Sequence, residues 1–398
     1  MNGSCACHGV HGPFAEMTHL SLAEYVCRFY QSRQFKLAKA FPLVPEAQTK
    51  VKNCKQTICI SSFDRRVAAN SMKSLTRVFR LIVVPGLFLF CLNIASAQSG
   101  WVANKVGLKG QDLNTVYFVD SKRGWIGGDN GFLSRTDDGG LTWSPQNVGT
   151  KQAINDIYFR DKEAGFLLAG NTIYITRDNG SVWQVSRKFL PTEFEGAEVE
   201  LYSVRFSSKK KGWVVGSISR DDRVIDSILV YTDDAGETWR RQRAPSRTEL
   251  IHIDFVSDKR GWIVGAGGTI LNTTDAGETW NKQTSGTTAT IYHIDFRDDK
   301  RGWVVGEHGT ILRTSDGGQT WTSVATSTKV TILSVQFLND DDGWAIGRSG
   351  TILRTQDQGK TWLQQDATTK QNLYALNFNK KVGWAVGGDG TVLRYERD

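Results

Sequence analysis

Short runs of hydrophobic and polar residues alternate over the last three-quarters of the chain, and the pattern repeats. In the copy at residues 290–322, apolar runs at 291–296, 302–306 and 310–314 are separated by turns rich in Gly, Asp and charged residues. Runs of β-branched and aromatic residues bounded by such turns predict short antiparallel strands. A fourth strand begins at Trp321, so each repeat predicts four strands and no helix.

Two aromatic positions mark every repeat. The first lies in the second strand and recurs at spacings of 41, 47, 49, 41, 41 and 40 residues, and the other begins the fourth strand. Four-stranded units at this period predict a β-propeller. All 13 tryptophans and Phe166 fill these positions: Trp125, Phe166, Trp213, Trp262, Trp303, Trp344 and Trp384 the first, and Trp101, Trp143, Trp183, Trp239, Trp280, Trp321 and Trp362 the second.

One repeat is divided between the two ends of this region. The seventh copy ends at 395–398, before its fourth strand, and residues 100–102 resemble the start of a fourth strand such as 142–144. A strand that joins the last blade from the N-terminal side closes the ring and removes its sheet edges. A linear solenoid would not divide a repeat in this way. We therefore predict an all-β fold for residues 98–398, a seven-bladed β-propeller of four-stranded antiparallel blades, closed by the strand around Trp101.

Six of the seven repeats have the sequence Thr-x-Asp-x-Gly between their third and fourth strands. The Asp carboxylate can accept N–H groups of its own turn, and the Gly can adopt a positive φ. Because an active site does not need six equivalent aspartates, a fold-stabilising role is the better interpretation. These Asp-box residues are Asp138, Asp178, Asp234, Asp275, Asp316 and Asp357.

Residues 1–97 differ in composition from the repeats. They contain all six cysteines, no tryptophan, and 12 Lys and Arg against 4 Asp and Glu. The remaining residues contain 37 of each sign, so the net charge of +8 belongs to the leader. This distribution argues against a propeller that binds nucleic acid.

Residues 72–97 have the features of a signal peptide: a basic segment, an apolar run at 81–94 and small residues at 95–97. The run is too short to predict a stable transmembrane helix. We interpret residues 1–71 as a disordered, over-extended start; a targeting segment, the first part of a two-part plastid leader, is the alternative. The mature chain is then expected to be extracytoplasmic: periplasmic, secreted or, in a photosynthetic organism, in the thylakoid lumen.

Few residues of the repeats suggest catalysis. No cysteine lies beyond residue 97, and no Gly-rich phosphate loop opens a helix. His252 and His293 occupy one repeat position, with Asp254 and Asp295 two residues later. They could form His–Asp dyads or part of a metal site, but repeat copies that face the channel or a neighbouring blade explain them as well. We expect no catalytic residue, metal or cofactor.

Arginine recurs at one third-strand position in blades 5, 6, 7 and 1, which ring closure makes neighbours. Because Arg binds carboxylates bidentately, this arginine arc predicts a partner-binding patch. In the structural alternative, each arginine pairs with an Asp of an adjacent blade. The arc consists of Arg135, Arg313, Arg354 and Arg394, whereas blades 2, 3 and 4 have Ile175, Tyr231 and Asn272.

Two connections near blade 3 are longer than their counterparts. From Trp183 to Val204 there are 21 residues, against 14 from Trp321 to Val335, and the connection between the second and third strands of blade 3 is also long. In an up-and-down blade, both lie on the same face. Long loops on a rigid scaffold often bind ligands. The possible loop site comprises Glu193, Glu195, Arg220, Asp222 and Arg223.

The repeat at 302–321, GWVVGEHGTILRTSDGGQTW, resembles those of the photosystem II assembly and stability factors of cyanobacteria and chloroplasts. The resemblance covers essentially all of 98–398. It implies a lumenal, non-enzymatic scaffold that binds a photosystem reaction-centre protein through an arginine-rich surface, which the arginine arc matches.

The Asp-box (BNR-type) turns also resemble those of sialidases, without a matching arginine triad or Tyr–Glu pair. We therefore expect a monomer that binds a protein, such as a subunit of a membrane complex. The alternatives are a glycan-binding or sialidase-like propeller and a generic secreted adhesion module.

Overall fold

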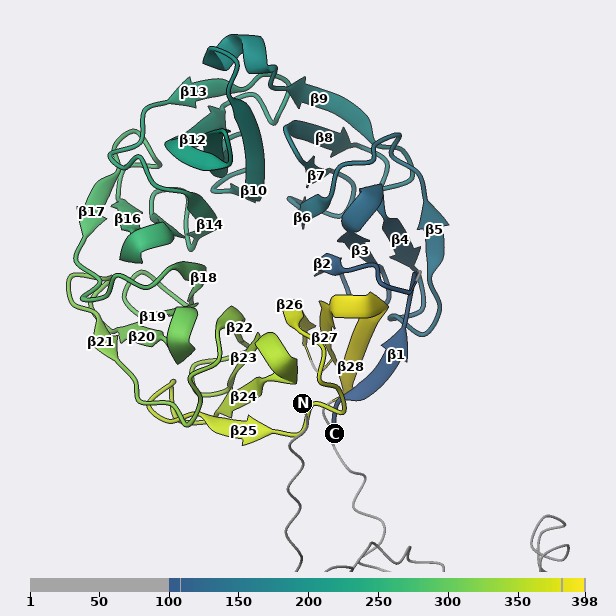
Figure 1. The fold of residues 1–398 in the computed structure, drawn as a ribbon, viewed down its shortest axis with the longest axis vertical. Coiled ribbons are helices and arrows are strands. Elements are labelled where there is room, and N and C mark those ends of the chain that lie inside the picture. Colours follow the sequence, from purple (N-terminus) through teal and green to yellow (C-terminus); the bar gives the residue numbers. More distant parts are fainter. Residues whose placement is uncertain (1–99, 108, 381, 397–398) are drawn as a thin grey trace, which may run out of the picture. The chain divides into compact units, whose positions relative to one another are not determined.

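The structure, a computed structural model, describes residues 100–107, 109–380 and 382–396, which form seven four-stranded antiparallel sheets around a central channel (Figure 1). Blades 1 to 3 contain β2 (Leu113–Phe118), β3 (Gly124–Gly128), β4 (Leu133–Thr136) and β5 (Ser144–Gln146); β6 (Ile154–Phe159), β7 (Gly165–Ala169), β8 (Thr172–Thr176) and β9 (Gln184–Lys188); and β10 (Glu198–Phe206), β11 (Gly212–Arg220), β12 (Arg223–Thr232) and β13 (Arg240–Gln242). Blades 4 to 6 contain β14 (Leu250–Phe255), β15 (Gly261–Gly265), β16 (Ile270–Thr273) and β17 (Asn281–Gln283); β18 (Ile291–Phe296), β19 (Gly302–Gly306), β20 (Ile311–Thr314) and β21 (Thr322–Ser323); and β22 (Ile332–Phe337), β23 (Gly343–Gly347), β24 (Ile352–Thr355) and β25 (Leu363–Gln365).

Blade 7 confirms the predicted closure of the ring. Its sheet has the order β1 (Val102–Lys105), β28 (Thr391–Glu396), β27 (Val382–Gly387) and β26 (Leu373–Asn379). The N-terminal strand β1 pairs antiparallel with β28, with Val102 opposite Arg394. Trp101 is only 3% exposed and packs edge-on against Trp344 of blade 6. The fourth strand of the last blade is therefore supplied by the start of the propeller.

The helical segments among the described residues are six short 3-10 turns. Five follow the second strands of their blades, and η2 lies in the long connection before β10. They are η1 (Asp129–Gly131), η2 (Pro191–Phe194), η3 (Ala266–Gly268), η4 (Glu307–Gly309), η5 (Arg348–Gly350) and η6 (Gly388–Gly390). In the part of the chain that the structure describes, no helix is long and apolar enough to span a membrane.

Aromatic rings join each blade to the next. Trp384 of blade 7 stacks on Phe118 of blade 1 with ring centroids 3.4 Å apart, and Trp262 stacks on Phe296 at 3.5 Å. The first-position aromatics are at most 2% exposed. Large rings buried in such pairs contribute packing energy beyond the area they remove from water. The conserved spacing of the aromatics along the repeats thus becomes a ring of contacts between blades.

A second set of contacts surrounds the channel. In several blades, the residue directly before the phenylalanine of the innermost strand reaches the backbone of the next blade: Asn377 accepts the Phe118 N–H at 3.1 Å, and Gln336 accepts the Phe378 N–H at 2.7 Å. Tyr117 instead donates its hydroxyl to the Phe159 carbonyl oxygen at 3.0 Å. These bonds satisfy backbone groups that β-ladder pairing leaves free at the inner edge.

The Asp-box turns are stabilised by their own side chains. Asp138 accepts the backbone N–H of Thr142 at 2.9 Å and its hydroxyl at 2.6 Å, and these bonds hold the pKa of Asp138 down to about 2. Gly140 has a φ of +84°, and a Cβ there would meet Trp384 Nε1 at 2.8 Å. Glycine is therefore required both by the backbone conformation and by the neighbouring blade. The turn joins local geometry to packing between blades.

The predictions for residues 1–71 and for the signal peptide at 72–97 lie outside the described residues.

Candidate functional site

The blades expose two different faces. One, which we call the Asp-box face, contains the Asp-box turns and the hairpins between first and second strands. The other, the turn face, contains the 3-10 turns and the connections between blades, because antiparallel strands alternate in direction. The arginines of the arc lie near the ends of their third strands, toward the Asp-box face. The long connections of blade 3 lie on the turn face.

Three members of the arginine arc already have bonds. Arg354 forms a fork with Asp342, with Nε–Oδ1 and Nη2–Oδ2 distances of 3.0 Å, and lies over the Trp344 ring. Arg394 donates to the Gly139 carbonyl oxygen at 3.1 Å, and Arg135 donates to the Asn179 carbonyl oxygen at the same distance. The acidic partners, such as Asp342, belong to the same blade as the arginine. The neighbouring blade therefore contributes carbonyl oxygens, not the Asp that the structural alternative expected.

Arg313 differs from the other three. It lies opposite Trp303 in the β19–β20 ladder and is half-buried, but within the described residues its side chain has no hydrogen bond or ion pair. Its five N–H donors are available to a ligand. The structure therefore places the four arginines on one face, with Arg313 the member that has free donors.

The long connections of blade 3 form a projecting hairpin and a helical turn. The strands β11 and β12 extend to the tip at Asp221 and Asp222, which both have positive φ. Arg220 Nη2 donates to the Glu195 carbonyl oxygen at 3.0 Å, so the two connections meet as expected. Glu193 accepts the Leu190 N–H at 2.9 Å and bonds to Arg187. Of the possible loop site, Glu193, Glu195 and Arg220 hold the loops together, while Asp222 and Arg223 form the tip.

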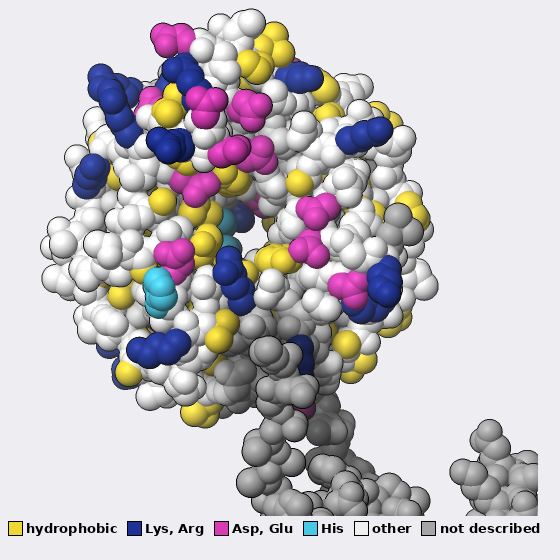
Figure 2. Space-filling model, viewed as in Figure 1, with side chains coloured by type: hydrophobic (Ala, Val, Ile, Leu, Met, Phe, Trp, Pro, Cys, Tyr) yellow, Lys and Arg dark blue, Asp and Glu magenta, His cyan; other side chains and the backbone are white. Residues whose placement is uncertain are grey.

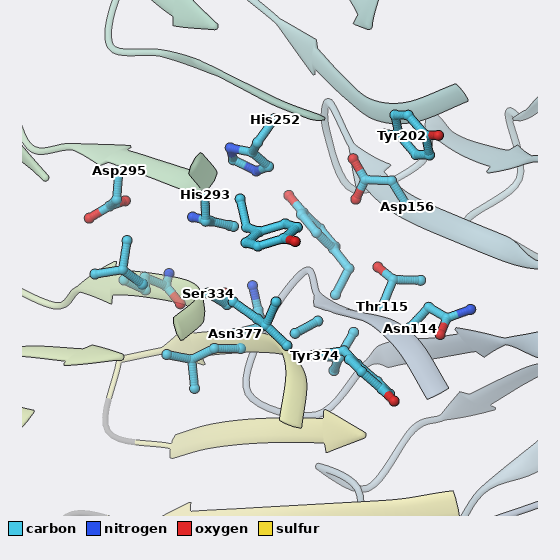
Figure 3. A pocket seen from close by; sticks show the side chains of 18 of the residues that line it. Asn114, Thr115, Asp156, Tyr202, His252, His293, Asp295, Ser334, Tyr374 and Asn377 are labelled. Atoms are coloured by element: carbon cyan, nitrogen blue, oxygen red, sulfur yellow. The ribbon is translucent and has the colours of Figure 1, made fainter. Parts of the chain in front are cut away.

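The central channel encloses a cavity of about 670 Å³, lined by the innermost strands of all seven blades (Figure 3). His252 and His293 lie inside it with their rings stacked, centroids 3.7 Å apart. The oxygens of Asp254 and Asp295 accept backbone N–H groups of the next blade, from Phe296 and Phe337. Their bonds thus belong to the inner ring of the fold. Among the described residues, no three His, Cys, Asp or Glu side chains gather to hold a metal ion.

Arg205 decides the protonation of His252. Its guanidinium bonds to Asp156 at 2.7 Å and to His252 Nε2 at 3.1 Å. Since Arg can only donate, Nε2 is the acceptor, and the proton of neutral His252 is on Nδ1. Burial, followed by the His293 ring and Arg205, holds the pKa of His252 well below its usual value. Burial also lowers the pKa of His293 to about 3.

The sequence reasoning missed the channel ring and Arg205. The position directly before the phenylalanine of each innermost strand holds Tyr117, Tyr158, Arg205, Asp254, Asp295, Gln336 and Asn377. These residue types have little in common except a polar group that can reach a backbone. A count of polar residues at this repeat position, between two apolar positions, would have marked it.

Comparison with known proteins identifies the family. The family model described as photosynthesis system II assembly factor YCF48 matches residues 143–248, 238–331 and 323–396. The chain belongs to this family. The match covers blades 2 to 7 and includes Arg313, Arg354 and Arg394 of the arginine arc.

Curated relatives agree with the family but match over limited lengths. The chloroplastic photosystem II stability/assembly factor HCF136 of Arabidopsis thaliana is 38% identical over 19% of this chain and 17% of its own length. The photosystem II assembly lipoprotein Ycf48 of Synechococcus sp. (strain CC9902) is 25% identical over 36% of this chain and 40% of its own. The matched part thus spans less than half of each relative.

Solved structures support the fold. The structure titled "YCF48 bound to D1 peptide" has a TM-score of 0.62 and 21% identity, covering 76% of this chain and 97% of that chain. YCF48 from Cyanidioschyzon merolae has a TM-score of 0.59 at 19% identity, covering 74% and 98%. The GH74 xyloglucanase from Xanthomonas campestris has a TM-score of 0.55 at 14% identity, covering 74% and 54%. At these identities, the similarity is one of architecture.

Proposed function

We propose that this protein is a non-catalytic, extracytoplasmic scaffold that assists photosystem II assembly by binding a reaction-centre polypeptide of the D1 type. The observation on which this rests is the arginine arc, which extends over neighbouring blades on one face of a propeller of this family. A solved family member of the same architecture is titled as bound to a D1 peptide. Arginine forks are suited to the carboxylates of a polypeptide partner.

Within the arc, we assign first contact to Arg313. The guanidinium of Arg354 forms a fork with Asp342, whose side chain is only 6% exposed, so its release would break an ion pair to a buried carboxylate. Arg135 and Arg394 give part of their donor capacity to turn carbonyl oxygens. Arg313 needs to break no bond of this kind before it binds a partner.

The test is capture of reaction-centre subunits from solubilised photosynthetic membranes by the full chain. Arg313→Glu should reduce capture at least about tenfold, because it places like charge opposite the partner's carboxylate. Arg313→Lys should retain part of the binding. The matched control is Arg243→Glu, an exposed arginine on the turn face. If Arg313→Glu and the control capture equally, the arginine arc is not the binding surface; if the unmodified chain captures no reaction-centre subunit, the proposed function is wrong.

A further inference from the structure

Large apolar side chains gather on the same side of the ring as the arginine arc. Of the eight that are exposed among the described residues, three belong to the long connections of blade 3, and five lie in blades 6, 7, 1 and 2. These five are between 54% and 69% exposed and belong to outermost strands or Asp-box turns. Single exposed apolar residues are normal, but a group of them on one side of a protein indicates an interaction surface. We call this group the apolar row: Leu363, Val102, Leu141, Val182 and Val185.

Two members of the apolar row lie beside arginines of the arc. Val102 is directly opposite Arg394 in the β1–β28 ladder, and Leu363 is directly opposite Arg354 in the β24–β25 ladder. The side chains of such cross-strand pairs share one face of the sheet, with Cβ atoms about 5 Å apart. The repeat itself does not require an apolar residue at this position. The other five blades have polar side chains there: Ser144, Gln184, Arg240, Asn281 and Thr322.

Leu141 continues the apolar row in the Asp-box turn of blade 1. The Gly139 carbonyl oxygen of this turn accepts from Arg394 at 3.1 Å, so the turn lies against the arc. A polar residue would serve the turn equally well, since every other Asp-box turn has one at the position of Leu141. These residues are Ser181, Glu237, Glu278, Gln319 and Lys360.

Val182 replaces a residue that stabilises the Asp-box turn in the other blades. The other five turns have a Thr here, whose hydroxyl donates to the Asp carboxylate, as Thr142 does to Asp138 at 2.6 Å. Val182 keeps the backbone bond to Asp178 at 2.9 Å but has no hydroxyl to donate. Its turn also contacts the arc, through a carbonyl oxygen that accepts from Arg135. A position that gives up a stabilising bond and exposes an apolar side chain is expected where the surface has a further role.

The turn face offers an acidic partner no comparable site. Figure 2 shows acidic side chains around the opening of the channel on this face. Glu249 lines the channel, and Glu307 and Asp112 are hydrogen-bonded to lining tyrosines. Carboxylates of a partner would be repelled there, whereas Arg313 has free donors at the Asp-box face. A partner that carries carboxylates is therefore directed to the face with the apolar row.

The arginine arc by itself offers such a partner little binding energy. Three of its four members are in ion pairs with acids of their own blades. Arg313 is left with free donors, and a single exposed ion pair contributes little to binding. Burial of apolar surface is the larger source of association free energy. The apolar row supplies such surface beside the arc.

We propose that the apolar row and Arg313 together bind a polypeptide segment that carries carboxylates and large apolar side chains on one face. Arg313 takes a carboxylate, and the apolar side chains pack against the row on blades 6, 7, 1 and 2. An anionic lipid surface fits this face less well, because the exposed carboxylates of Asp137 and Glu396 would lie against its headgroups. That the segment comes from a reaction-centre polypeptide rests on the proposed function, whereas its chemistry does not.

The test is isothermal titration calorimetry of the full chain with the peptide Ac-Ala-Glu-Ala-Leu-Ala-Glu-Ala-Leu-Ala-NH₂. In an extended chain, its Glu and Leu side chains share one face, about 7 Å apart. Two matched peptides have Ser in place of Leu or Gln in place of Glu. We expect the Glu–Leu peptide to bind at least about tenfold more tightly than either, because each matched peptide loses one of the two kinds of contact.

Variants of the chain identify the surface that binds. Leu141→Ser with Leu363→Ser should weaken binding of the Glu–Leu peptide at least about tenfold and leave that of the Glu–Ser peptide unchanged. Arg313→Gln should weaken binding of the Glu–Leu peptide and leave that of the Gln–Leu peptide unchanged. The matched control is Val224→Ser with Ile225→Ser, which removes exposed apolar side chains from the blade 3 hairpin and should have no effect. Thermal unfolding confirms that each variant is folded.

The outcomes separate the possible occupants. Equal affinity for the three peptides, no measurable binding of the Glu–Leu peptide, or unchanged binding by the Leu141–Leu363 variant would overturn the proposal. If the unmodified chain co-sediments with vesicles of phosphatidylglycerol and phosphatidylcholine and this variant does not, the apolar row docks on lipid, and the polypeptide assignment is wrong. A dimer in analytical ultracentrifugation that the variant abolishes would mean that a second copy covers the row, with the same consequence. Val102→Ser takes the place of the double variant if that variant does not fold.

The peptides also separate this inference from the proposed function. If they bind as expected but the unmodified chain captures no reaction-centre subunit, the proposed function is wrong and the chemistry of the surface stands. If capture succeeds and the peptide affinities do not differ, the proposed function stands and the apolar row is not its binding surface.

Discussion

The junction between blades 7 and 1 and the junction between blades 2 and 3 solve the same packing problem with different chemistry. At the closing junction, Trp384 stacks on Phe118 and donates its Nε1 proton to the Gly139 carbonyl oxygen at 3.0 Å. Arg394 donates to the same oxygen, and Asn377 holds the backbone of Phe118. Three polar contacts thus accompany the stacked rings.

At the second junction, the stacked ring and the third-strand position are both apolar. Phe166 lies on Phe206 at 4.4 Å and has no N–H to donate, and Ile175 stands where an arginine lies in blade 7. A large cluster of buried apolar side chains, including Phe189 and Val199 from the long connection, fills the space instead. Polar contacts cross this junction elsewhere: Asp156 is bonded to the Val204 N–H and to Arg205 near the channel, and Ser186 donates its hydroxyl to the Gly236 carbonyl oxygen at 2.6 Å.

The difference follows from what each junction must specify. Blades 2 and 3 are linked by the chain, so their proximity is partly assured. Blade 7 meets blade 1 across a large separation in sequence, and joining distant segments costs loop-closure entropy. Directional bonds at Gly139 and Phe118 fix which surfaces meet, whereas apolar packing tolerates the longer strands and η2 of blade 3. The region that departs from the repeat is therefore the one that can hold extended loops.

The largest expected effect comes from removing the stacked ring at each junction. Trp384→Ala and Phe166→Ala should each lower the free energy of unfolding by about 3–5 kcal/mol, through lost burial and a cavity. Trp384→Ala should cost more, because it also removes the hydrogen bond to Gly139. Urea unfolding of the full chain, followed by far-ultraviolet circular dichroism, measures both, and Trp384→Phe isolates the hydrogen bond. If Phe166→Ala loses more free energy of unfolding than Trp384→Ala, the hydrogen bond of Trp384 does not make the closing junction the more stable one.

A smaller effect is expected from the channel ring. Asn377→Leu leaves the Phe118 N–H of the closing junction without an acceptor, at a cost of about 1–3 kcal/mol. Tyr117→Phe, at the junction of blades 1 and 2, removes only a hydroxyl bond to the Phe159 carbonyl oxygen and should cost about 1 kcal/mol. Hydrogen exchange at the amide of Phe118 should accelerate in Asn377→Leu alone. Unchanged exchange there would show that the ring bond does not stabilise the closing junction.

Much of this architecture could be predicted because the same pattern of strands, turns and aromatic positions occurs in every repeat. The spacing of Trp303 and Trp344 predicted the blades, and the resemblance of residues 100–102 to 142–144 predicted that β1 completes blade 7. Periodicity could not predict which bonds the arginines make, since Asp342 comes from another hairpin of the same blade and Gly139 comes close only after the blades pack. The unpaired state of Arg313 and the tautomer of His252 likewise depend on neighbours from distant segments.

The channel was harder to foresee for a related physical reason. Its lining comes from one or a few residues of every blade, and those residues differ in type. His252 and His293 were visible as a repeated pair, but Arg205, which orients one of them, lies in another blade at a position where the repeat has acids, amides or tyrosines. Ring closure brings these side chains together, and no local pattern encodes that distance.

The smallest expected effect tests whether the Asp-box turns at the two junctions are stabilised in the same way, although the packing at the junctions differs. Asp138 lies in the turn that Trp384 contacts, and Asp234 in the turn whose Gly236 meets Phe166. Bonds from Thr142 lower the pKa of Asp138 to about 2. That of Asp234 is also about 2, because bonds from Thr238 outweigh burial, which raises it.

A pKa lowered from roughly 3.9 in the unfolded chain stabilises the fold above pH ~4, and the stabilisation is lost as the pH falls through about 2. Asp138→Asn and Asp234→Asn should therefore each lose stability at pH 6, and their difference from the unmodified chain should narrow as the pH approaches 2. Urea midpoints measured from pH 2 to 6 give the two differences. If the difference in urea midpoint narrows equally in both variants, the Asp-box turn is stabilised by its own bonds and not by the packing between the blades. If the stability difference narrows for Asp138→Asn alone, the stabilising effect of the Asp138 charge depends on the closing junction and its bonds to Gly139.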